Sequence, residues 1–289
     1  MRIVIVGGVA AGMSAAARAR RLDEHAEIIV LERGNHVSFA NCGLPYYVGG
    51  EIADRSSLLV QTPESLKAAL DLDVRVRHEA VGLDAASKTV TVRSDAGEEE
   101  LAYDALILAP GAFALRPPIE GLDSPRVRTL RTVEDAIAMR DTVEAGARRA
   151  VVLGAGFIGI EAAEALRLQG LEVDLVEFAP HVLPPLEIEV AAAVTAELGR
   201  IGITVNDGVA AQSIERGHDH DTVVLADGRR LEADLIVLSV GVRPDTAVFE
   251  AAGVECARGA MIVDEHGRTN LPAVYAAGDA VVSTDKVTG

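Results

Sequence analysis

The stretch AVVLGAGFIG, residues 150–159, decides how this chain of 289 residues folds, because a second version of it opens the sequence. That second version is RIVIVGGVAAG, residues 2–12. Each has a short apolar run, a glycine-rich turn and the beginning of an Ala-rich segment, which predicts a buried strand, a turn and a helix. The chain therefore contains an internal repeat.

The repeat continues beyond each predicted helix. An apolar strand ending in an acid follows, EIIVLE up to Glu32 and EVDLVE up to Glu177. Farther on, YDALILAPG (103–111) and ADLIVLSVG (233–241) each run from an aspartate through an apolar strand to a glycine. Each follows an alternating, charge-punctuated stretch that predicts an antiparallel hairpin. We expect an α/β fold of two similar nucleotide-binding units.

The boundaries between the units are predicted from breaks in the pattern. Consecutive prolines and a glycine in FALRPPIEGLDSPRV (113–127) interrupt any regular element. The late strand AVYAAGDA would have no sheet of its own unless the chain returned to the first unit near GVRPD (241–245). We expect a discontinuous first domain of residues 1–115 plus 243–289, and a second domain of residues 116–242.

Composition excludes several classes of function. The formal net charge of −17 repels phosphate backbones and anionic lipid surfaces, so neither nucleic acid nor membrane is an expected partner. No apolar run approaches the roughly 20 residues of a spanning helix, and the N-terminus lacks a signal-peptide pattern. Two distant cysteines form neither a disulfide framework nor a metal-ligand cluster. We expect a cytoplasmic protein with no metal site.

The second glycine turn carries the complete G-x-G-x-x-G pattern, as Gly154, Gly156 and Gly159. Such turns occur in any α/β fold, but Glu177 at the end of the next strand is where a carboxylate binds a ribose diol in dinucleotide sites. Because a carboxylate there would repel a 2′-phosphate, NADH is favoured over NADPH.

The first glycine turn departs from this pattern. It keeps Gly7 and Gly12 but has Val9 in place of the middle glycine. Glu32 at the expected distance and the likeness to the second copy favour a second dinucleotide site. Two such sites indicate electron transfer between two cofactors. Asp279, after a late strand and a glycine, either caps a helix or faces the ribityl and pyrophosphate part of a flavin.

One further segment, SFANCGLPYYVGG at residues 38–50, has a single cysteine among small residues and glycines. With the two dinucleotide units and the AAGDA segment at Asp279, it resembles the single-cysteine branch of the FAD-dependent pyridine nucleotide-disulfide oxidoreductases. That branch contains coenzyme A-disulfide reductases, NADH oxidases and NADH peroxidases. The resemblance implies two Rossmann-like domains of the glutathione-reductase type, one for FAD and one for NAD(P)H, each with an antiparallel β insertion.

The resemblance also implies a set of site residues, with Cys42 as the redox centre. The implied FAD-binding residues are Gly7, Gly8, Val9, Ala10, Ala11, Gly12, Glu32, Arg33, Asn41, Ala109, Pro110, Gly111 and Asp279. Those implied for NAD(P)H are Gly154, Gly156, Phe157, Ile158, Gly159 and Glu177. Those implied for coenzyme A are Ser14, Arg18, Arg21, Ser38 and Asn41.

The branches of this family differ at positions that can be read directly. Dithiol reductases have a partner cysteine where this chain has Tyr47, or Pro45 in the thioredoxin reductase type, so an internal disulfide is excluded. A lone thiol must cycle through a sulfenic acid or a mixed disulfide with a small thiol. Oxidase and peroxidase members typically have a histidine where this chain has Ala10, which weakens the peroxidase interpretation.

The helix predicted after the first turn favours coenzyme A. Ser14, Arg18 and Arg21 lie on one face of it, and guanidinium groups match the phosphates of an anionic thiol. Considered without the family, that face is a solvated one balanced by Asp23 and Glu24. With the resemblance, we expect it to bind coenzyme A.

Cys42 itself precedes Pro45, a residue suited to the first turn of a helix, where backbone N–H groups stabilise a thiolate. Cys256 is expected to be inert. The favoured hypothesis is that NADH reduces FAD, which in turn reduces a mixed disulfide between Cys42 and coenzyme A. The alternatives are an NADH oxidase or peroxidase that uses a sulfenic acid, and a non-catalytic cofactor-binding module.

The chain stops soon after Asp279, where members of the family continue into an interface domain. We expect that C-terminal domain to be absent here, and a homodimer where it is present. The sequence leaves open whether the substrate is a disulfide or a persulfide.

Overall fold

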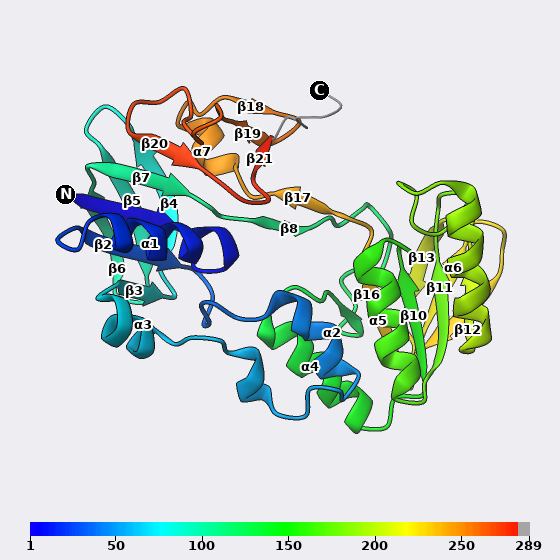
Figure 1. Ribbon diagram of the computed structural model, residues 1–289. Coiled ribbons are helices and arrows are strands. Elements are labelled where there is room, and N and C mark those ends of the chain that lie inside the picture. The colour runs from blue at the N-terminus through cyan, green and yellow to red at the C-terminus, as the bar shows by residue number, and fades with distance from the viewer. Residues whose placement is uncertain (283–289) are drawn as a thin grey trace. The chain divides into compact units, whose positions relative to one another are not determined.

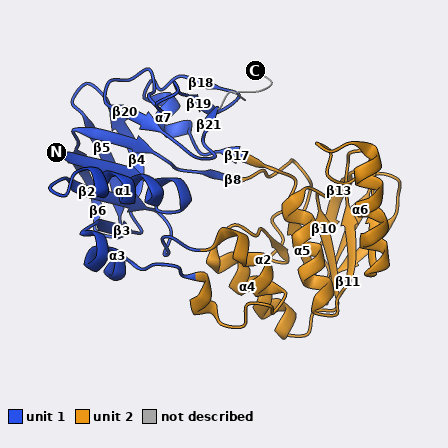
Figure 2. Cartoon of the chain, viewed as in Figure 1, with its two compact units in different colours: residues 1–39, 59–113, 243–289 blue, residues 40–58, 114–242 orange. Residues whose placement is uncertain are grey.

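The computed structural model describes residues 1–282 and divides by its contacts into two compact units (Figure 2). Unit 1 comprises residues 1–39, 59–113 and 243 onward, and unit 2 comprises residues 40–58 and 114–242. The expected first domain, 1–115, included the segment 40–58, whose contacts lie with unit 2 instead. Which cofactor each unit binds stays a prediction.

Unit 1 is built on a five-stranded parallel sheet in the order β20-β7-β1-β2-β3 (Figure 1). Alternate residues of the strands point to opposite faces, and both faces are buried, as parallel sheets require. Ile3 and Ile5 pack with helices of the unit, whereas Val4 and Val6 pack in a second core with the β insertion. The strands are β1 (Arg2–Val6), β2 (Glu27–Glu32), β3 (Asp73–Val76), β7 (Ala105–Leu108) and β20 (Val274–Ala276), and the helices are α1 (Ala10–Leu22), α3 (Pro63–Leu70) and α7 (Ala247–Ala251).

The β insertion of unit 1 is a three-stranded antiparallel sheet, as the alternating sequence predicts. A smaller sheet and a two-stranded ladder complete the unit, and the ladder marks the places where the chain passes between the units. These strands are β4 (Glu79–Asp84), β5 (Thr89–Ser94), β6 (Gly97–Ala102), β18 (Cys256–Ala257), β19 (Ala260–Ile262) and β21 (Val281–Val282), with β8 (Ala112–Ala114) and β17 (Val242–Pro244) in the ladder.

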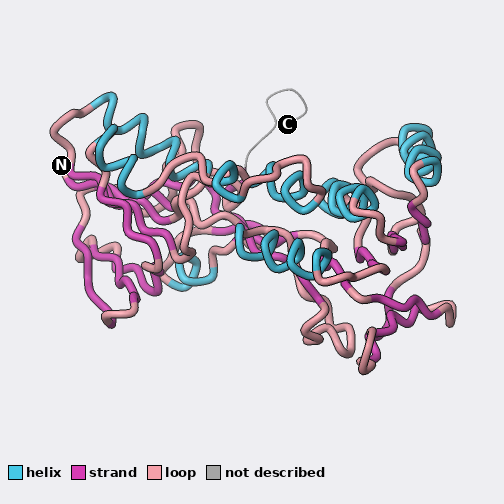
Figure 3. Tube along the Cα trace, turned by 90° about the horizontal axis from the view of Figure 1, so that it is seen from below, coloured by secondary structure: helices cyan, strands magenta, loops and turns pink. Residues whose placement is uncertain are grey.

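Unit 2 has a second five-stranded parallel sheet, in the order β12-β11-β10-β16-β9, and its own antiparallel insertion. The alternation of strand and helix can be followed along the Cα trace (Figure 3). Its strands are β9 (Val127–Arg128), β10 (Arg149–Leu153), β11 (Glu172–Val176), β12 (Ile203–Asn206), β13 (Ala211–Glu215), β14 (Asp221–Leu225), β15 (Arg230–Ala233) and β16 (Leu235–Leu238). Its helices are η1 (Asn41–Gly43), α2 (Leu44–Val48), η2 (Arg55–Leu58), α4 (Val133–Glu144), α5 (Phe157–Leu168) and α6 (Ile188–Arg200).

The two sheets are equivalent at four of their five positions, which confirms the predicted repeat. β1, β2, β3 and β7 correspond to β10, β11, β12 and β16. The outermost strand beside β7 is β20, which comes last in its sheet along the chain, whereas the strand beside β16 is β9, which comes first. The predicted return of the late strand to the first unit is thus confirmed.

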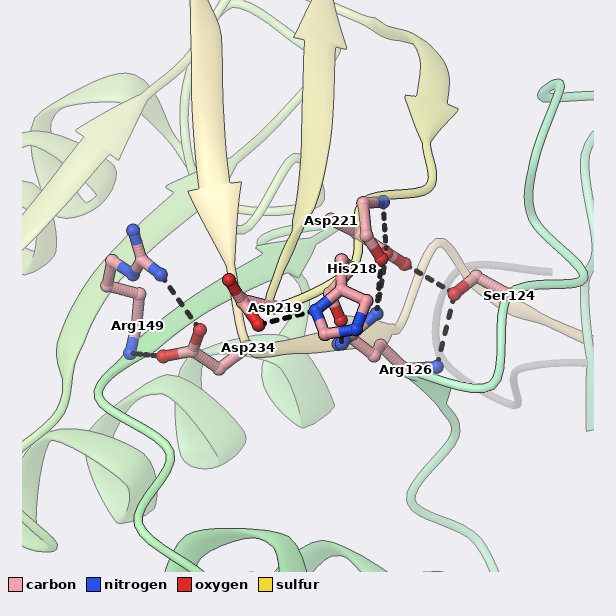
Figure 4. Close-up of polar contacts among 8 residues, drawn as sticks. Ser124, Arg126, Arg149, His218, Asp219, Asp221 and Asp234 are labelled. Carbon is pink, nitrogen blue, oxygen red and sulfur yellow. Dashed lines mark hydrogen bonds and ion pairs between the residues drawn. The ribbon is translucent and has the colours of Figure 1, made fainter.

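A buried carboxylate joins the β insertion of unit 2 to the segment that precedes β9 (Figure 4). Asp221 is fully buried and accepts hydrogen bonds from the Ser124 hydroxyl, from Nη1 of Arg126 at 2.9 Å and from the Gly217 N–H at 3.2 Å. A buried charge costs little only when it is paired and hydrogen-bonded, and Asp221 is both.

Within residues 1–282, no helix is long and apolar enough to cross a membrane. In the same range, no group of three or more His, Cys, Asp or Glu side chains is placed to hold a metal ion.

Candidate functional site

The first glycine turn lies between β1 and α1, and its glycines are required by close backbone contacts. Gly7 has a φ of +102°, and a Cβ there would lie 1.9 Å from the Ala109 carbonyl oxygen. A Cβ on Gly12 would lie 1.9 Å from the Gly7 oxygen. The turn is therefore pressed between the carboxyl end of β7 and the first turn of α1. The N-terminus of α1 faces this edge of the sheet. The N–H groups of its first turn are those that would donate hydrogen bonds to a pyrophosphate.

Glu32, at the end of β2, binds the backbone of this turn. Its Oε2 accepts the Gly8 N–H at 2.8 Å and its Oε1 accepts the Gly34 N–H at 2.6 Å. Each carboxylate oxygen can accept a second hydrogen bond, so both retain acceptor capacity for the hydroxyls of a ribose. The carboxylate is thereby fixed in place before any ligand arrives.

A pocket in unit 1 gathers several of the predicted residues around Glu32. Gly7, Arg33 and Pro110 line it with Glu32. The Arg33 guanidinium forms an ion pair with Asp245, which also lines the pocket and whose N–H donates to the Gly111 oxygen at 3.0 Å. Asp245 was not predicted, because it is distant from Arg33 in the sequence and follows no motif.

The remaining predicted residues of unit 1 flank the same edge of the sheet. Ala109 extends β7, and its N–H donates to the Val6 oxygen at 2.7 Å. Asp279 is exposed and follows Gly278, where a Cβ would lie 2.7 Å from the Cβ of Ala11. The backbone just before Asp279 therefore lies against the beginning of α1, and the role of Asp279 at a flavin stays a prediction.

A second cavity of unit 1, about 500 Å³, borders the later residues of this turn. Val9 and Ala10 line it, and Ser14 and Ser38 bring hydroxyl groups to it. The rest of the lining is mainly apolar and includes Phe39, Val60 and Leu66. The structure thus brings together two of the residues expected to bind the substrate.

Arg18 and Arg21 continue the exposed face of α1 beyond Ser14. The solvated interpretation predicted that Asp23 and Glu24 would balance them. Asp23 instead accepts the His25 N–H at 2.9 Å, and Glu24 lies 3.6 Å from Nε2 of His25. Among residues 1–282, neither arginine forms an ion pair, so both guanidinium groups remain available to an anionic ligand.

The neighbouring Arg20, which the sequence interpretation did not single out, has a structural role. Its guanidinium donates to the carbonyl oxygens of Leu70 at 2.8 Å and Asp71 at 3.0 Å. It also donates to the carbonyl oxygens of Asp23 and Glu24. Arg20 thereby holds the end of α1 to the end of α3.

The second glycine turn repeats this construction in unit 2. Gly154 has a φ of +98°, and a Cβ there would lie 2.5 Å from the Ser239 oxygen. A Cβ on Gly159 would lie 1.9 Å from the Gly154 oxygen, whereas a Cβ on Gly156 would have no protein atom within 4 Å. Gly156 therefore leaves open the space through which a pyrophosphate would approach the backbone. The turn fits a dinucleotide.

Glu177 binds its turn as Glu32 does. Its Oε2 accepts the Ala155 N–H at 2.7 Å and its Oε1 accepts the Ala179 N–H at 2.7 Å. A cavity of about 620 Å³ borders it and is lined by Gly154, Gly156, Phe157 and Ile158 among others. Glu177 is the one ionisable side chain in this lining. The cavity therefore suits an uncharged ribose diol and offers no cation to a 2′-phosphate.

Cys42 lies in unit 2, on the 3-10 helix η1 together with Asn41. Its thiol is exposed and free. Pro45 occupies the first turn of α2, as predicted, but the residue that precedes this helix is Gly43, so Cys42 lies one position earlier than the N-cap. A Cβ on Gly43 would lie 3.2 Å from both Ala40 and Leu58 side-chain atoms, so the turn that carries the thiol is tightly packed.

Cys256, by contrast, is part of β18 and half-buried. Burial, and then the nearby Glu250 carboxylate, raise the pKa of its thiol. Both effects favour the neutral thiol, in agreement with the expectation that this cysteine is inert.

Comparison with known proteins finds relatives of this chain among enzymes named as oxidases and reductases. A curated NADH oxidase from Methanocaldococcus jannaschii is 34% identical over 100% of this chain and 65% of its own length. A coenzyme A disulfide reductase from Staphylococcus haemolyticus is 34% identical over 98% of this chain and 64% of its own length. The solved structure of an NAD-dependent persulfide reductase from A. fulgidus superposes with a TM-score of 0.95, at 39% identity, over 97% of this chain and 53% of that one.

The chain thus spans less than two thirds of the length of these relatives. Residues 1–288 match the family described as pyridine nucleotide-disulphide oxidoreductase. With two glycine turns, each bound by its own acid, and two parallel sheets that are equivalent at four of their five positions, the chain belongs to the pyridine nucleotide-disulphide oxidoreductase family.

Proposed function

We propose that the protein is an FAD-dependent reductase that uses NADH to reduce coenzyme A disulfide, or a persulfide of coenzyme A or another small thiol, through Cys42. The observation that carries this proposal is the exposed lone thiol on η1, in a chain with two duplicated dinucleotide turns. The names of the relatives support it, since they include a coenzyme A disulfide reductase and a persulfide reductase.

In this proposal each unit binds one of the two cofactors. Unit 1 would hold FAD, with Glu32 at its ribose and the Gly7–Gly12 turn at its pyrophosphate. Unit 2 would hold the nicotinamide cofactor in the cavity beside Glu177, and the absence of a cation from its lining favours NADH over NADPH. Bound FAD supplies the chemistry of taking a hydride from NADH and giving an electron pair to sulfur.

Coenzyme A is favoured as the thiol because α1 presents two arginines that have no ion-pair partner among residues 1–282, in a protein that is strongly acidic as a whole. Arg18 and Arg21 would bind phosphate groups, since guanidinium donors match phosphate oxygens in pairs. In the 500 Å³ cavity, the Ser14 and Ser38 hydroxyls would donate hydrogen bonds to the amide carbonyl oxygens of the arm of the ligand, whose methylene groups would pack on the apolar lining. Asn41, next to Cys42, would hydrogen-bond near the thiol end.

Cys42 performs the bond exchange. Its thiolate attacks one sulfur of the disulfide, a bond forms between Sγ and that sulfur, and the second thiol leaves as a thiolate that takes a proton. Two electrons then cleave the mixed disulfide, which regenerates the Cys42 thiolate and releases the first thiol after it gains a proton. Each cycle oxidises one NADH and releases two thiols.

An NADH oxidase or peroxidase is the second candidate, because the relative from Methanocaldococcus jannaschii carries the name NADH oxidase. In that case Cys42 would cycle through a sulfenic acid. Ala10, at the start of α1, offers no acid or base to a peroxide and weakens this alternative. A non-catalytic cofactor-binding module is the third candidate, and homodimer formation stays a prediction.

The experiment that tests the proposal is an anaerobic titration of the purified protein with NADH, followed by addition of coenzyme A disulfide. We expect the flavin absorbance to bleach, to recover with the disulfide and to release two thiols per NADH. Cys42→Ser should keep the bleaching and lose the recovery, whereas Cys256→Ser should keep both. Recovery with oxygen or peroxide alone would favour the second candidate, and absence of bleaching would favour the third.

A further inference from the structure

We infer that Arg140, on α4, is a positioning residue that fixes the turn carrying Cys42. The inference rests on the proposed role of Cys42 and adds to it the means by which this thiol is held. No residue of α4 belongs to either glycine turn, and the sequence gives Arg140 no motif.

The element that carries Cys42 cannot hold its own shape. η1 has three residues and α2 has five, far below the 12 to 15 or so that an isolated helix needs in water. Its conformation must therefore come from contacts with other elements. The carbonyl groups at the end of such a short helix also lack partners within the helix.

Arg140 adds a side-chain donor at this end, where the Tyr47 oxygen also accepts the Gly50 N–H, at 3.2 Å. Its Nη1 donates to the carbonyl oxygens of Tyr47 at 3.0 Å and Ile52 at 3.1 Å. The guanidinium carbon lies 4.6 Å from the centre of the Tyr47 ring, and Tyr47 is 9% exposed. The same cation thus neutralises the carbonyl end of α2 and stacks on its largest buried side chain.

The orientation of Arg140 is itself fixed. Its Nε donates to Glu144 at 2.8 Å, one turn farther along α4. The Arg140 side chain is 22% exposed, so the bonds to the two carbonyl groups are partly shielded from water. A lysine ammonium could donate to these carbonyl groups, but it has no second nitrogen to donate to Glu144 and no plane to stack on the Tyr47 ring.

A second contact holds the same segment from the C-cap of α5. Nε2 of Gln169 donates to the Gly49 oxygen at 2.6 Å. A Cβ on Gly49 would lie 3.3 Å from the Cα of Ala165, which shows how closely the end of α2 approaches α5. Arg140 and Gln169 together tie the residues after Cys42 to two long helices of unit 2.

The consequence is that loss of Arg140 loosens the thiol without touching either dinucleotide turn. Catalytic geometry is sensitive to such loosening, because a displacement of about 1 Å can lower a rate by about a hundredfold. Electron transfer to the disulfide should therefore slow, whereas binding and oxidation of NADH should not.

The test uses the flavin-loaded protein with Arg140→Met, Arg140→Lys and Gln169→Leu. For Arg140→Met we expect kcat with coenzyme A disulfide to fall about tenfold or more. The KM for NADH and the rate of anaerobic flavin bleaching should stay within about twofold of wild type. Arg140→Lys should restore part of kcat, and Gln169→Leu should lower it.

Hydrogen exchange reports on the position of the turn without reference to activity. The amides of residues 41–52 should exchange at least about tenfold faster in Arg140→Met than in wild type, at a temperature where both remain folded. The matched control is Arg200→Met, which removes a 70% exposed arginine paired with Glu197 on α6 of the same unit and should change nothing.

The outcomes separate the inference from the proposed function. Unchanged exchange at 41–52, or an Arg140→Met enzyme with normal kcat and only a lower thermal midpoint, would overturn the positioning role. Failure of wild type itself to reduce disulfides would overturn the proposed function, and the exchange measurement would still decide whether Arg140 holds the turn.

Discussion

At the scale of single residues, Glu32 and Glu177 combine two roles, one as a predicted ligand of ribose and one as an acceptor of backbone N–H groups. Each was predicted from its distance to a glycine turn, as a ligand of ribose. In the structure each also accepts two backbone N–H groups, one of them from the turn itself. The sequence could not reveal this second role, because it depends on how the loop after the strand folds back.

A residue-scale prediction concerns Asp234, which precedes β16 in unit 2 (Figure 4). Burial raises the pKa of its carboxyl, but hydrogen bonds from the Arg149 guanidinium and from the N–H groups of Arg148 and Arg149 outweigh burial, so the pKa lies below its ordinary value. A lowered pKa contributes stability above the unfolded pKa of about 3.9, and this contribution is lost as the pH falls through the folded pKa.

Asp234→Ala should therefore lower the free energy of unfolding by about 1.5–3 kcal/mol at pH 7. The difference from wild type should shrink below about pH 4. Urea unfolding at several pH values measures it. Asp219→Ala is the control, because that side chain is 85% exposed and pairs only with His218 in Figure 4. A difference between wild type and Asp234→Ala that stays constant down to pH 3 would contradict the account.

At the scale of elements, two glycines of the turn in unit 2 should have different roles, one in folding and one in cofactor binding. Gly154→Ala adds a Cβ at positive φ, 2.5 Å from a backbone oxygen, and should destabilise the protein by about 1–3 kcal/mol. Gly156→Ala adds a Cβ in open space at a φ of −76°, so the thermal midpoint should hold. That methyl group would occupy the approach of the pyrophosphate, so NADH binding should weaken about tenfold or more.

Fluorescence titration with NADH and thermal unfolding, made on both variants, check this prediction. Gly199→Ala, in α6 with no atom within 4 Å, is the matched control and should stabilise by about 0.5–1 kcal/mol. Normal NADH affinity in Gly156→Ala would show that the cofactor does not approach this turn.

The elements also show how far sequence could predict this molecule. Both sheets, both turns and both insertions follow from periodicity and glycine spacing, which are local signals. The segment 40–58 does not, because a 3-10 turn and a five-residue helix have no periodicity. Its packing depends on Arg140 and Gln169, whose partners lie far from them along the chain. The neighbouring residues in the sequence predicted the role of Cys42, but they did not predict the contacts that hold its turn.

At the scale of the whole molecule, the two units have separate cores and should respond to separate ligands. We expect calorimetry to resolve two unfolding transitions. NADH should raise the transition temperature of unit 2. At a free NADH concentration one hundred times Kd, this corresponds to about 2.7 kcal/mol of added free energy of unfolding. Glu177→Ala should abolish that shift, and Glu172→Ala, at the opposite end of β11, should keep it. A single transition that responds equally to both cofactors would contradict the prediction.

The position of β20 has a consequence for the order in which the protein is made. The sheet of unit 2 is complete once residue 238 has been synthesised, because β16 is its last strand. The sheet of unit 1 waits for residues 274–276, although its first strand begins at Arg2. On the ribosome, then, unit 2 can fold while the sheet of unit 1 still lacks its edge strand β20. The site in unit 1 that we propose for FAD would be the later of the two to mature, and the incomplete sheet would be the part most in need of chaperones.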